Sequence, residues 1–188
     1  MTLHGANLWL SLTTDQPKQV LVAGTGFGSA FTTYQSPCFA GLGGSVQATS
    51  DDVLWAVCPT GMLAELSRST DGGAHWQLLH PLGKASPLPN SALLAPAGDA
   101  AALLAPSSQG QLLRTTDGGA TWHQLPSPAG TSAYWSWIGF TDATTGAGLA
   151  VATTAPANWP WPKGPPPEHL WRTADGGATW SGPVAIAG

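Results

Sequence analysis

Charged residues are scarce in this chain of 188 residues. They make up only 9% of it, with six Lys and Arg against ten Asp and Glu, for a formal net charge of −4. A protein that binds nucleic acid needs a stripe of basic side chains to neutralise phosphates. Six cations spread over the whole chain cannot form such a stripe, so we expect no nucleic-acid partner.

Long apolar runs are absent as well. No stretch approaches the roughly 20 consecutive apolar residues that a membrane-spanning helix needs, so the sequence predicts no membrane span. The first residues, Met1–Leu12, have neither the basic start nor the apolar length of a signal peptide.

The patterns of common metal and cofactor sites are also missing. The five His residues form no H-x-H or H-E-x-x-H pattern, and the Gly-rich stretches carry no Walker-type Lys. The sequence therefore predicts no metal and no cofactor.

What the chain does contain is a repeated signature of eight residues. Its three copies are Ser69–Trp76, Thr115–Trp122 and Thr173–Trp180; each reads Ser/Thr-x-Asp-Gly-Gly-Ala-x-Trp. An Arg precedes each copy, and a Leu lies five residues before each Asp. Self-similarity at such intervals indicates a repeat architecture.

The signature itself predicts a β-hairpin. Asp-Gly between apolar stretches is typical of a tight turn with positive φ at both central residues. The Asp side chain can accept hydrogen bonds from nearby backbone N–H groups, and the Trp can fold back over the turn. Each copy is thus expected to be a turn that satisfies its own polar groups under an aromatic clamp.

These copies resemble the Asp-box, or BNR, repeat found in sialidases, photosystem II assembly factor-like propellers and sortilin-type ectodomains. The residues that match its fixed positions are Ser69, Asp71, Gly73 and Trp76; Thr115, Asp117, Gly119 and Trp122; and Thr173, Asp175, Gly177 and Trp180. The resemblance implies an all-β β-propeller of four-stranded antiparallel blades, with each box between the third and fourth strands. It does not imply sialidase chemistry, because the box lies away from the catalytic pocket of that family.

A fourth, eroded copy lies upstream, with Gly24, Gly26, Gly28 and Phe31 in the places of the four fixed residues. The chain then reads as one domain, 1–188, with repeat units at about 1–37, 45–80, 90–126 and 133–185. The strands expected around the first two full boxes include Val53–Cys58, Leu63–Thr70, Ala101–Ala105 and Gln111–Thr116. Alternation along 134–140 sends Trp135 and Trp137 to the same side of their strand.

The first unit shows no innermost strand of its own. About four units, the first of them incomplete, are at the lower limit for a propeller of 4 to 8 blades. The chain is therefore expected to be part of a larger propeller, or a half that pairs as a homodimer or with additional blades. The alternative is a ring that these four units close by themselves.

The two cysteines are expected on the same rim. Cys38 falls in a connection between units and Cys58 at the end of a second strand, both on the side opposite the boxes. A disulfide and two free, buried thiols both remain open. A disulfide would favour an extracellular or cell-envelope protein.

Catalytic sets are not recognisable. Sialidases of the resembled family hold a carboxylate with three arginines, but here Arg68, Arg114 and Arg172 each adjoin a box and are expected to serve their own hairpin. Glu65 and Glu168 are the only glutamates. We therefore predict no catalytic residue.

One segment departs from the repeat. The Pro/Trp-rich loop 155–169 lengthens the last unit and falls on the rim opposite the boxes; its candidate binding residues are Trp159, Trp161, Lys163, Glu168 and His169. The alternative is a rigid insertion whose Trp residues seal a neighbouring blade.

The function predicted from these features is a non-catalytic binding or assembly scaffold, whose rim loop meets a protein or carbohydrate partner. One alternative is a fragment of a sialidase-like glycoside hydrolase with its catalytic residues outside this chain. Another is a purely structural propeller subunit.

Overall fold

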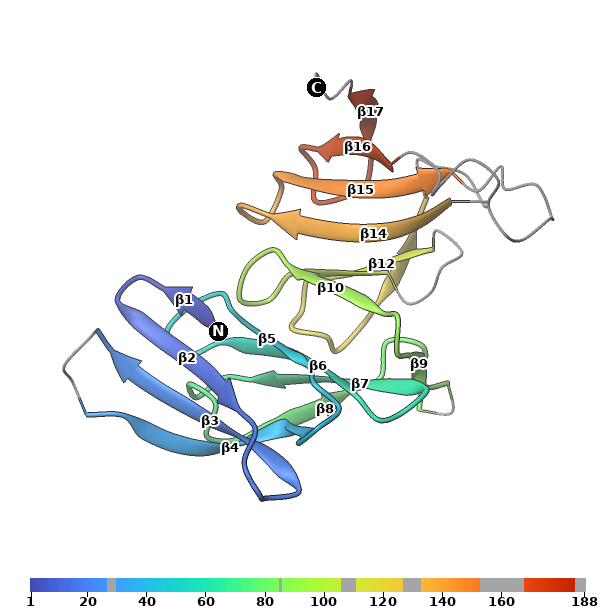
Figure 1. Ribbon diagram of the computed structural model, residues 1–188. Helices are drawn as coiled ribbons and strands as arrows, with labels where there is room; N and C mark the ends of the chain where they lie inside the picture. Colours follow the sequence, from blue (N-terminus) through green and yellow to red (C-terminus); the bar gives the residue numbers. More distant parts are fainter. Residues whose placement is uncertain (27–29, 85, 106–110, 127–132, 153–167, 185–188) are drawn as a thin grey trace.

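The computed structural model describes residues 1–26, 30–84, 86–105, 111–126, 133–152 and 168–184. Within these ranges the chain forms strands and turns and no helix. Figure 1 shows four antiparallel sheets, one after another along the chain, with the N-terminus in the first sheet and the C-terminus beside the last. The predicted all-β class is confirmed.

Each sheet follows the order of its strands in the chain, as in a propeller blade. The first sheet contains β1 (Thr2–His4), β2 (Asn7–Leu12), β3 (Lys18–Thr25) and β4 (Thr32–Phe39). The second contains β5 (Ser45–Ala48), β6 (Leu54–Pro59), β7 (Leu63–Ser69) and β8 (Gln77–Leu79), with β9 (Leu88–Pro89) paired to β7. The third contains β10 (Leu93–Pro96), β11 (Ala102–Ala105), β12 (Leu112–Thr115) and β13 (His123–Leu125), and the fourth β14 (Ala133–Phe140), β15 (Gly146–Ala152), β16 (Glu168–Thr173) and β17 (Ser181–Val184).

The first sheet is complete, so the prediction of an incomplete first unit is wrong. Residues Thr2–His4 form the innermost strand and pair with β2 in the register Thr2↔Trp9 to His4↔Asn7. The strand is only three residues long, which is too short for its alternation of polar and apolar residues to be recognised in the sequence.

The hydrophobic core lies between the sheets. The second strand of the second sheet shows the reason: Leu54 packs toward the first sheet, while Trp55 packs toward the third, and both are fully buried. A strand covered on both faces reads as a continuous apolar run, as Leu54–Cys58 does. A separate cluster fills the junction of the third and fourth sheets, where the Trp135 and Trp180 rings lie 4.8 Å apart.

Trp137 does not share the burial of Trp135. A register shift falls between these two residues on β14, and Trp137 is 49% exposed on the other face of the sheet. A β-bulge reverses the alternation of side chains beyond it, so the expectation that both rings lie on one side is wrong.

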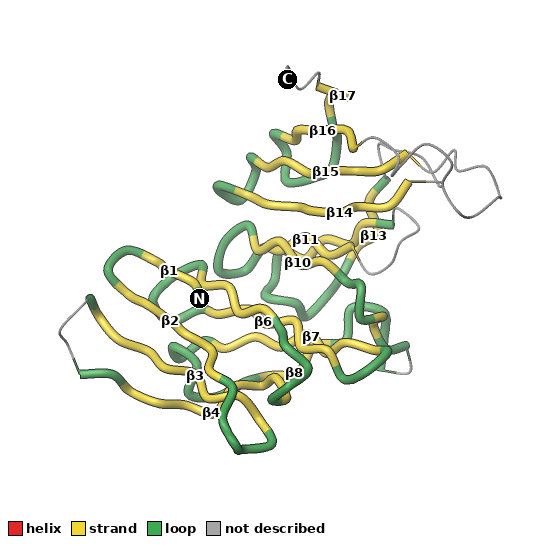
Figure 2. The backbone as a smooth tube through the Cα atoms, in the orientation of Figure 1, coloured by secondary structure: helices red, strands yellow, loops and turns green. Residues whose placement is uncertain are grey.

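The turns that join first to second and third to fourth strands lie together on one side of the sheets (Figure 2). In each sheet a backbone hydrogen bond ties them: Gly26 N to Ala6 O, Gly72 N to Asp52 O, Gly118 N to Ala100 O and Gly176 N to Thr144 O, all at 2.8 Å. We call this side the turn face and the opposite side the rim face.

Candidate functional site

The three Asp-Gly-Gly turns carry the same hydrogen bonds. In the first turn, the Ser69 hydroxyl donates to Asp71 Oδ1 at 2.8 Å and accepts from the Gly73 N–H at 2.9 Å. Asp71 Oδ1 also accepts from the backbone N–H of His75 at 2.9 Å. The turns at Asp117 and Asp175 repeat this arrangement with Thr115 and Thr173 in place of Ser69.

The positive φ angles of these turns fall on their two glycines and not on Asp. Gly72 has φ of 70° and Gly73 of 101°, and among the described residues only glycines have positive φ. The Asp backbone stays in an ordinary conformation that aims its carboxylate back at the turn. The expected placement of positive φ on Asp-Gly is corrected to Gly-Gly.

A tryptophan closes each turn from outside. The indole N–H groups of Trp76, Trp122 and Trp180 donate to the carbonyl oxygens of Gly73, Gly119 and Gly177 at 3.0 to 3.1 Å. Each Trp comes just before its outer strand and is partly buried. The ring thus satisfies a carbonyl of the turn while it packs against the core.

These hydrogen bonds keep the turn carboxylates ionised. The pKa of Asp71 falls to about 2, chiefly because the backbone N–H of His75 donates to it. The pKa values of Asp117 and Asp175 also fall to about 2, chiefly through the hydroxyls of Thr121 and Thr179. Carboxylates held in this way are poorly suited to exchange protons near neutral pH.

Two of the three arginines before the turns, Arg68 and Arg114, bind the following sheet, so the expectation that each arginine serves its own hairpin is wrong. Arg68 donates from Nε and Nη2 to the main-chain oxygen of Asp99 at 3.1 and 2.8 Å. Arg114 donates from Nη1 to the main-chain oxygen of Asp175 at 3.0 Å. The Arg68 guanidinium also lies 5.3 Å from the centre of the Trp55 ring.

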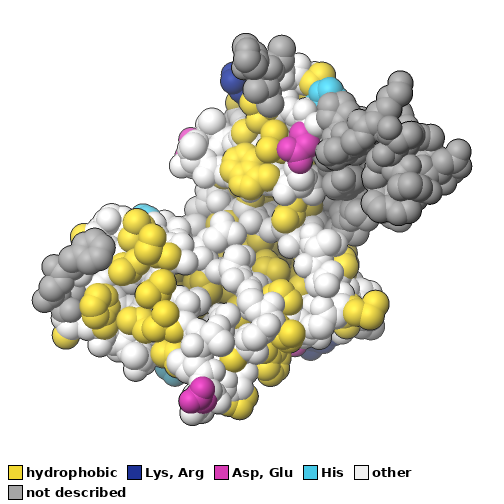
Figure 3. Space-filling view, viewed as in Figure 1, with side chains coloured by type: hydrophobic (Ala, Val, Ile, Leu, Met, Phe, Trp, Pro, Cys, Tyr) yellow, Lys and Arg dark blue, Asp and Glu magenta, His cyan; other side chains and the backbone are white. Residues whose placement is uncertain are grey.

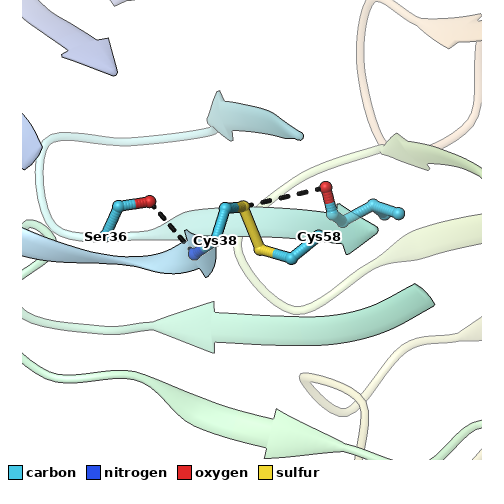
Figure 4. The surroundings of a disulfide bond; sticks show 4 residues. Ser36, Cys38 and Cys58 are labelled. Carbon is cyan, nitrogen blue, oxygen red and sulfur yellow. Dashed lines mark hydrogen bonds between the residues drawn. A yellow bond between two sulfur atoms is a disulfide. The ribbon is translucent and has the colours of Figure 1, made fainter. Parts of the chain in front are cut away.

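A disulfide joins the first two sheets. Cys38 on β4 and Cys58 on β6 are bonded and completely buried (Figure 4). The Cys38 N–H donates to the Ser36 hydroxyl at 3.2 Å, and the Cys38 sulfur lies 3.9 Å from the carbonyl oxygen of Val57. Cys38 lies in the outermost strand and not in the connection after it, because β4 extends to Phe39.

All four sheets contribute to a cavity of about 490 Å³ on the turn face. Its lining includes His4, Thr49, Gly98 and Asp142, each at or just beyond an innermost strand. Two polar side chains of the lining bind carboxylates outside it: His4 Nδ1 lies 3.1 Å from Asp51 Oδ1, and Thr49 donates to Asp99 Oδ1 at 2.9 Å. Sequence reasoning missed this cavity because its wall comes from four separate turns without a shared motif.

The candidate binding residues of the rim are only partly described. Trp159, Trp161 and Lys163 lie outside the described residues. Glu168 and His169 begin β16, where they pair with Val151 and Ala150. Glu168 is exposed and His169 is half-buried.

Metal ligands do not gather in the described part of the chain, where no group of three His, Cys, Asp or Glu side chains could hold an ion. In the same residues no helix is long and apolar enough to cross a membrane.

No protein-family model and no curated protein sequence matches the chain. Among solved structures, a GH74 enzyme from Niastella koreensis superposes with a TM-score of 0.55 at 16% identity, over 94% of this chain and 36% of the enzyme. YCF48 from Cyanidioschyzon merolae gives a TM-score of 0.48 at 18% identity, over 96% of this chain and 70% of that protein. YCF48 bound to a D1 peptide gives 0.46 at 16% identity, over 95% and 64%.

The chain therefore spans little more than a third of the length of the GH74 enzyme. At this low identity the likeness concerns the fold alone. Together with four consecutive four-stranded antiparallel sheets, it shows an all-β fold of the propeller type.

Proposed function

We propose that this chain is an Asp-box propeller that works as a non-catalytic binding or assembly scaffold for a protein partner. One observation carries the proposal: the three turn carboxylates and two of the three repeated arginines are engaged by the main chain. The carboxylates of Asp71, Asp117 and Asp175 accept from their own turns, while Arg68 and Arg114 donate to the next sheet. These groups hold sheets in place and are not directed at a substrate.

The partner is expected on the rim face, at segment 155–169. In the sequence, Trp159, Trp161 and Lys163 precede Glu168, which is exposed at the start of β16. Tryptophan is among the residues that contribute most to protein–protein contacts. A carbohydrate partner would also stack on these rings, and the test distinguishes the two.

The test is site-specific photo-crosslinking in cells of the source organism. A photoreactive residue is placed at position 159 or 161, and at Met62 as a control. Met62 is 86% exposed in the turn between β6 and β7, which belongs to the same rim. One protein crosslinked from 159 and 161 but not from 62 would support the proposal.

Crosslinking to the same extent from all three positions would contradict a site at this segment. A glycan array probed with the same variants covers the carbohydrate partner. Turnover of sialosides or aryl glycosides by the purified chain would contradict the proposed scaffold function and support the glycoside hydrolase alternative. The likeness to the GH74 enzyme does not favour that alternative, because it extends to the fold alone.

We also propose an extracellular or cell-envelope location. The support is the buried Cys38–Cys58 bond, since disulfides persist in oxidising compartments and are rare in the cytosol. Thiol labelling of the protein in intact cells tests this location: unlabelled cysteines are expected, and quantitative labelling after denaturation without reductant would contradict it.

A further inference from the structure

The outer surface of the fourth sheet has the residue types of a junction between sheets, but no sheet of the described residues covers it. The leucine that lies five residues before the turn Asp shows the difference. Leu66 and Leu112 are 0% exposed beneath the next sheet, as is Leu21 at the matching place in the first sheet. Leu170 holds the same place in the fourth sheet and is partly exposed.

The arginine series ends in the same way. Arg68 and Arg114 reach main-chain oxygens of the following sheet, whereas Arg172 is exposed and its guanidinium donates to no described residue. Beside it lies a mostly apolar hollow of about 390 Å³ lined by Trp137, Phe140, Ala147 and Arg172. We call the surface formed by Trp137, Ala147, Leu149, Leu170 and Arg172 the trailing face.

The first sheet leaves the opposite kind of surface uncovered. Leu10 is at the strand position that Ala56 and Leu104 hold in the second and third sheets. Ala56 and Leu104 pack against the preceding sheet and are 0% exposed, whereas Leu10 is only half-buried. Leu3 is 61% exposed, and Phe31, in the place of the turn Trp, is 50% exposed. We call the surface formed by Leu3, Leu8, Leu10, Val20 and Val22 the leading face.

Hydrophobic side chains gather over both end sheets in Figure 3, at the left over β1–β4 and again over the upper sheet. Consecutive sheets make extended contacts, and within the described ranges no contact of similar extent joins the first sheet to the fourth. The trailing face and the leading face are thus the two complementary surfaces of one type of junction, and both are uncovered on the same chain.

We propose that the trailing face of one copy binds the leading face of a second copy, in the way that consecutive sheets bind within the chain. We assign a second copy to the trailing face because the leading face of that copy carries the groups found at each internal junction. Its leucines and valines would lie opposite Leu170, and one of its turns would lie opposite Arg172. Two such junctions close a pair of copies into a ring of eight blades, which is within the range of known propellers.

Register identifies the acceptor for Arg172. Arg68 donates to the carbonyl of Asp99, the residue before Ala100, and Ala100 O accepts from the glycine of the turn, Gly118. In the first sheet, Ala6 O accepts from Gly26 in the same way, so Gly5 holds the place of Asp99. Arg114 reaches the other turn of its following sheet, at the main-chain oxygen of Asp175. Arg172 of one copy is therefore expected to donate to a main-chain oxygen in the turns of the other copy's first sheet, where Gly5 holds the place of Asp99.

The first test is the mass of the purified chain in solution, by light scattering over about a 100-fold range of concentration, because dimer stability depends on protomer concentration. A species with twice the chain mass is expected. A monomer throughout, or open-ended polymers, would overturn the closed pair and leave the end faces to further blades.

The second test separates the two faces. Trp137→Asp on the trailing face and Leu10→Asp on the leading face should each yield monomers, with Met62→Asp on the rim as the matched apolar-to-charge control that still dimerises. If Leu10→Asp does not fold by circular dichroism, Leu3→Asp replaces it.

Mixing the two monomeric variants is decisive. The Leu10→Asp copy retains its trailing face and the Trp137→Asp copy its leading face, so the mixture should regain one-to-one pairs through a single junction. No pairs in the mixture, or pairs within either variant alone, would overturn the head-to-tail junction. Arg172→Ala should weaken dimerisation about tenfold per junction, whereas Lys84→Ala, which removes an exposed cation elsewhere, should not; equal effects would remove the arginine from the junction.

Discussion

Arg68 of the second sheet donates two hydrogen bonds to the main-chain oxygen of Asp99 in the third sheet, from Nε at 3.1 Å and from Nη2 at 2.8 Å. Its guanidinium also lies over the Trp55 ring, which is completely buried. The fork of the guanidinium supplies both donors at once, which the single ammonium of Lys cannot do. The contact joins two blades through the main chain, so it depends little on the side chain at position 99.

We therefore expect Arg68→Ala to lower the free energy of unfolding by about 1–2 kcal/mol, since two charge-assisted hydrogen bonds are lost at a partly exposed site. Arg172→Ala is the matched control, because it removes the same residue from the same repeat position without a described partner. Both are measured by urea denaturation in the monomeric Trp137→Asp background, where association does not contribute. Equal losses for the two variants would contradict the role given to Arg68.

The tryptophans of the full turn motifs should contribute more to the free energy of unfolding than Phe31, which takes their place in the eroded first copy. Trp122→Ala should cost about 3 kcal/mol, because the ring packs on the core between the second and third sheets and donates to Gly119 O. Phe31→Ala should cost less than about 1 kcal/mol, since Phe31 is half exposed. Chemical denaturation followed by circular dichroism ranks the two; a larger loss at Phe31 would show that the first copy is not eroded in function.

Acid should weaken the turns in a defined window. The pKa of Asp117 lies at about 2 in the folded protein, below its ordinary value, so the ionised form is favoured by folding. Its contribution is complete above the unfolded pKa and is lost as pH falls through about 2. Thermal melting between pH 6 and pH 2 should show a smaller loss for Asp117→Asn than for the parent chain. A parallel pH dependence in both would show that the carboxylate is not stabilised by its turn.

Reduction of the disulfide should destabilise the protein by about 3 kcal/mol, because the bond closes a loop with a sequence separation of 20 residues. Urea unfolding with and without dithiothreitol measures the difference. The Cys38→Ala/Cys58→Ala double variant serves as control and should be insensitive to the reductant. If the parent chain were equally insensitive, the bond would not contribute to its stability.

The strands beside the turns could be predicted from sequence because each Asp-Gly-Gly turn sets the register on both sides of it. The expected strand Leu63–Thr70 corresponds to β7, Leu63–Ser69, and Gln111–Thr116 to β12, Leu112–Thr115. The short β1 carries no such marker. Its three residues are identified only by their pairing with β2, which is a tertiary feature.

The reach of Arg68 and the exposure of Trp137 could not be predicted for a different reason. The guanidinium contacts Asp99 only because the next sheet lies at the right distance, and no local pattern encodes the spacing of sheets. Trp137 changes face because one β-bulge interrupts the alternation of β14. The candidate site is predictable to the same extent: the turn residues follow from the motif, while the cavity and the end faces follow from assembly.

The bond between Cys38 and Cys58 makes unravelling directional in a single chain. Arrays of repeats open from their ends inward, since a terminal unit has only one neighbour. At the N-terminal end, the disulfide links β4 to β6. The first blade therefore cannot unfold and separate from the second without disturbing β6, an inner strand of the second blade. The C-terminal blade has no such covalent link in the described chain. Its backbone amide hydrogens should therefore exchange with deuterium before those of any other blade.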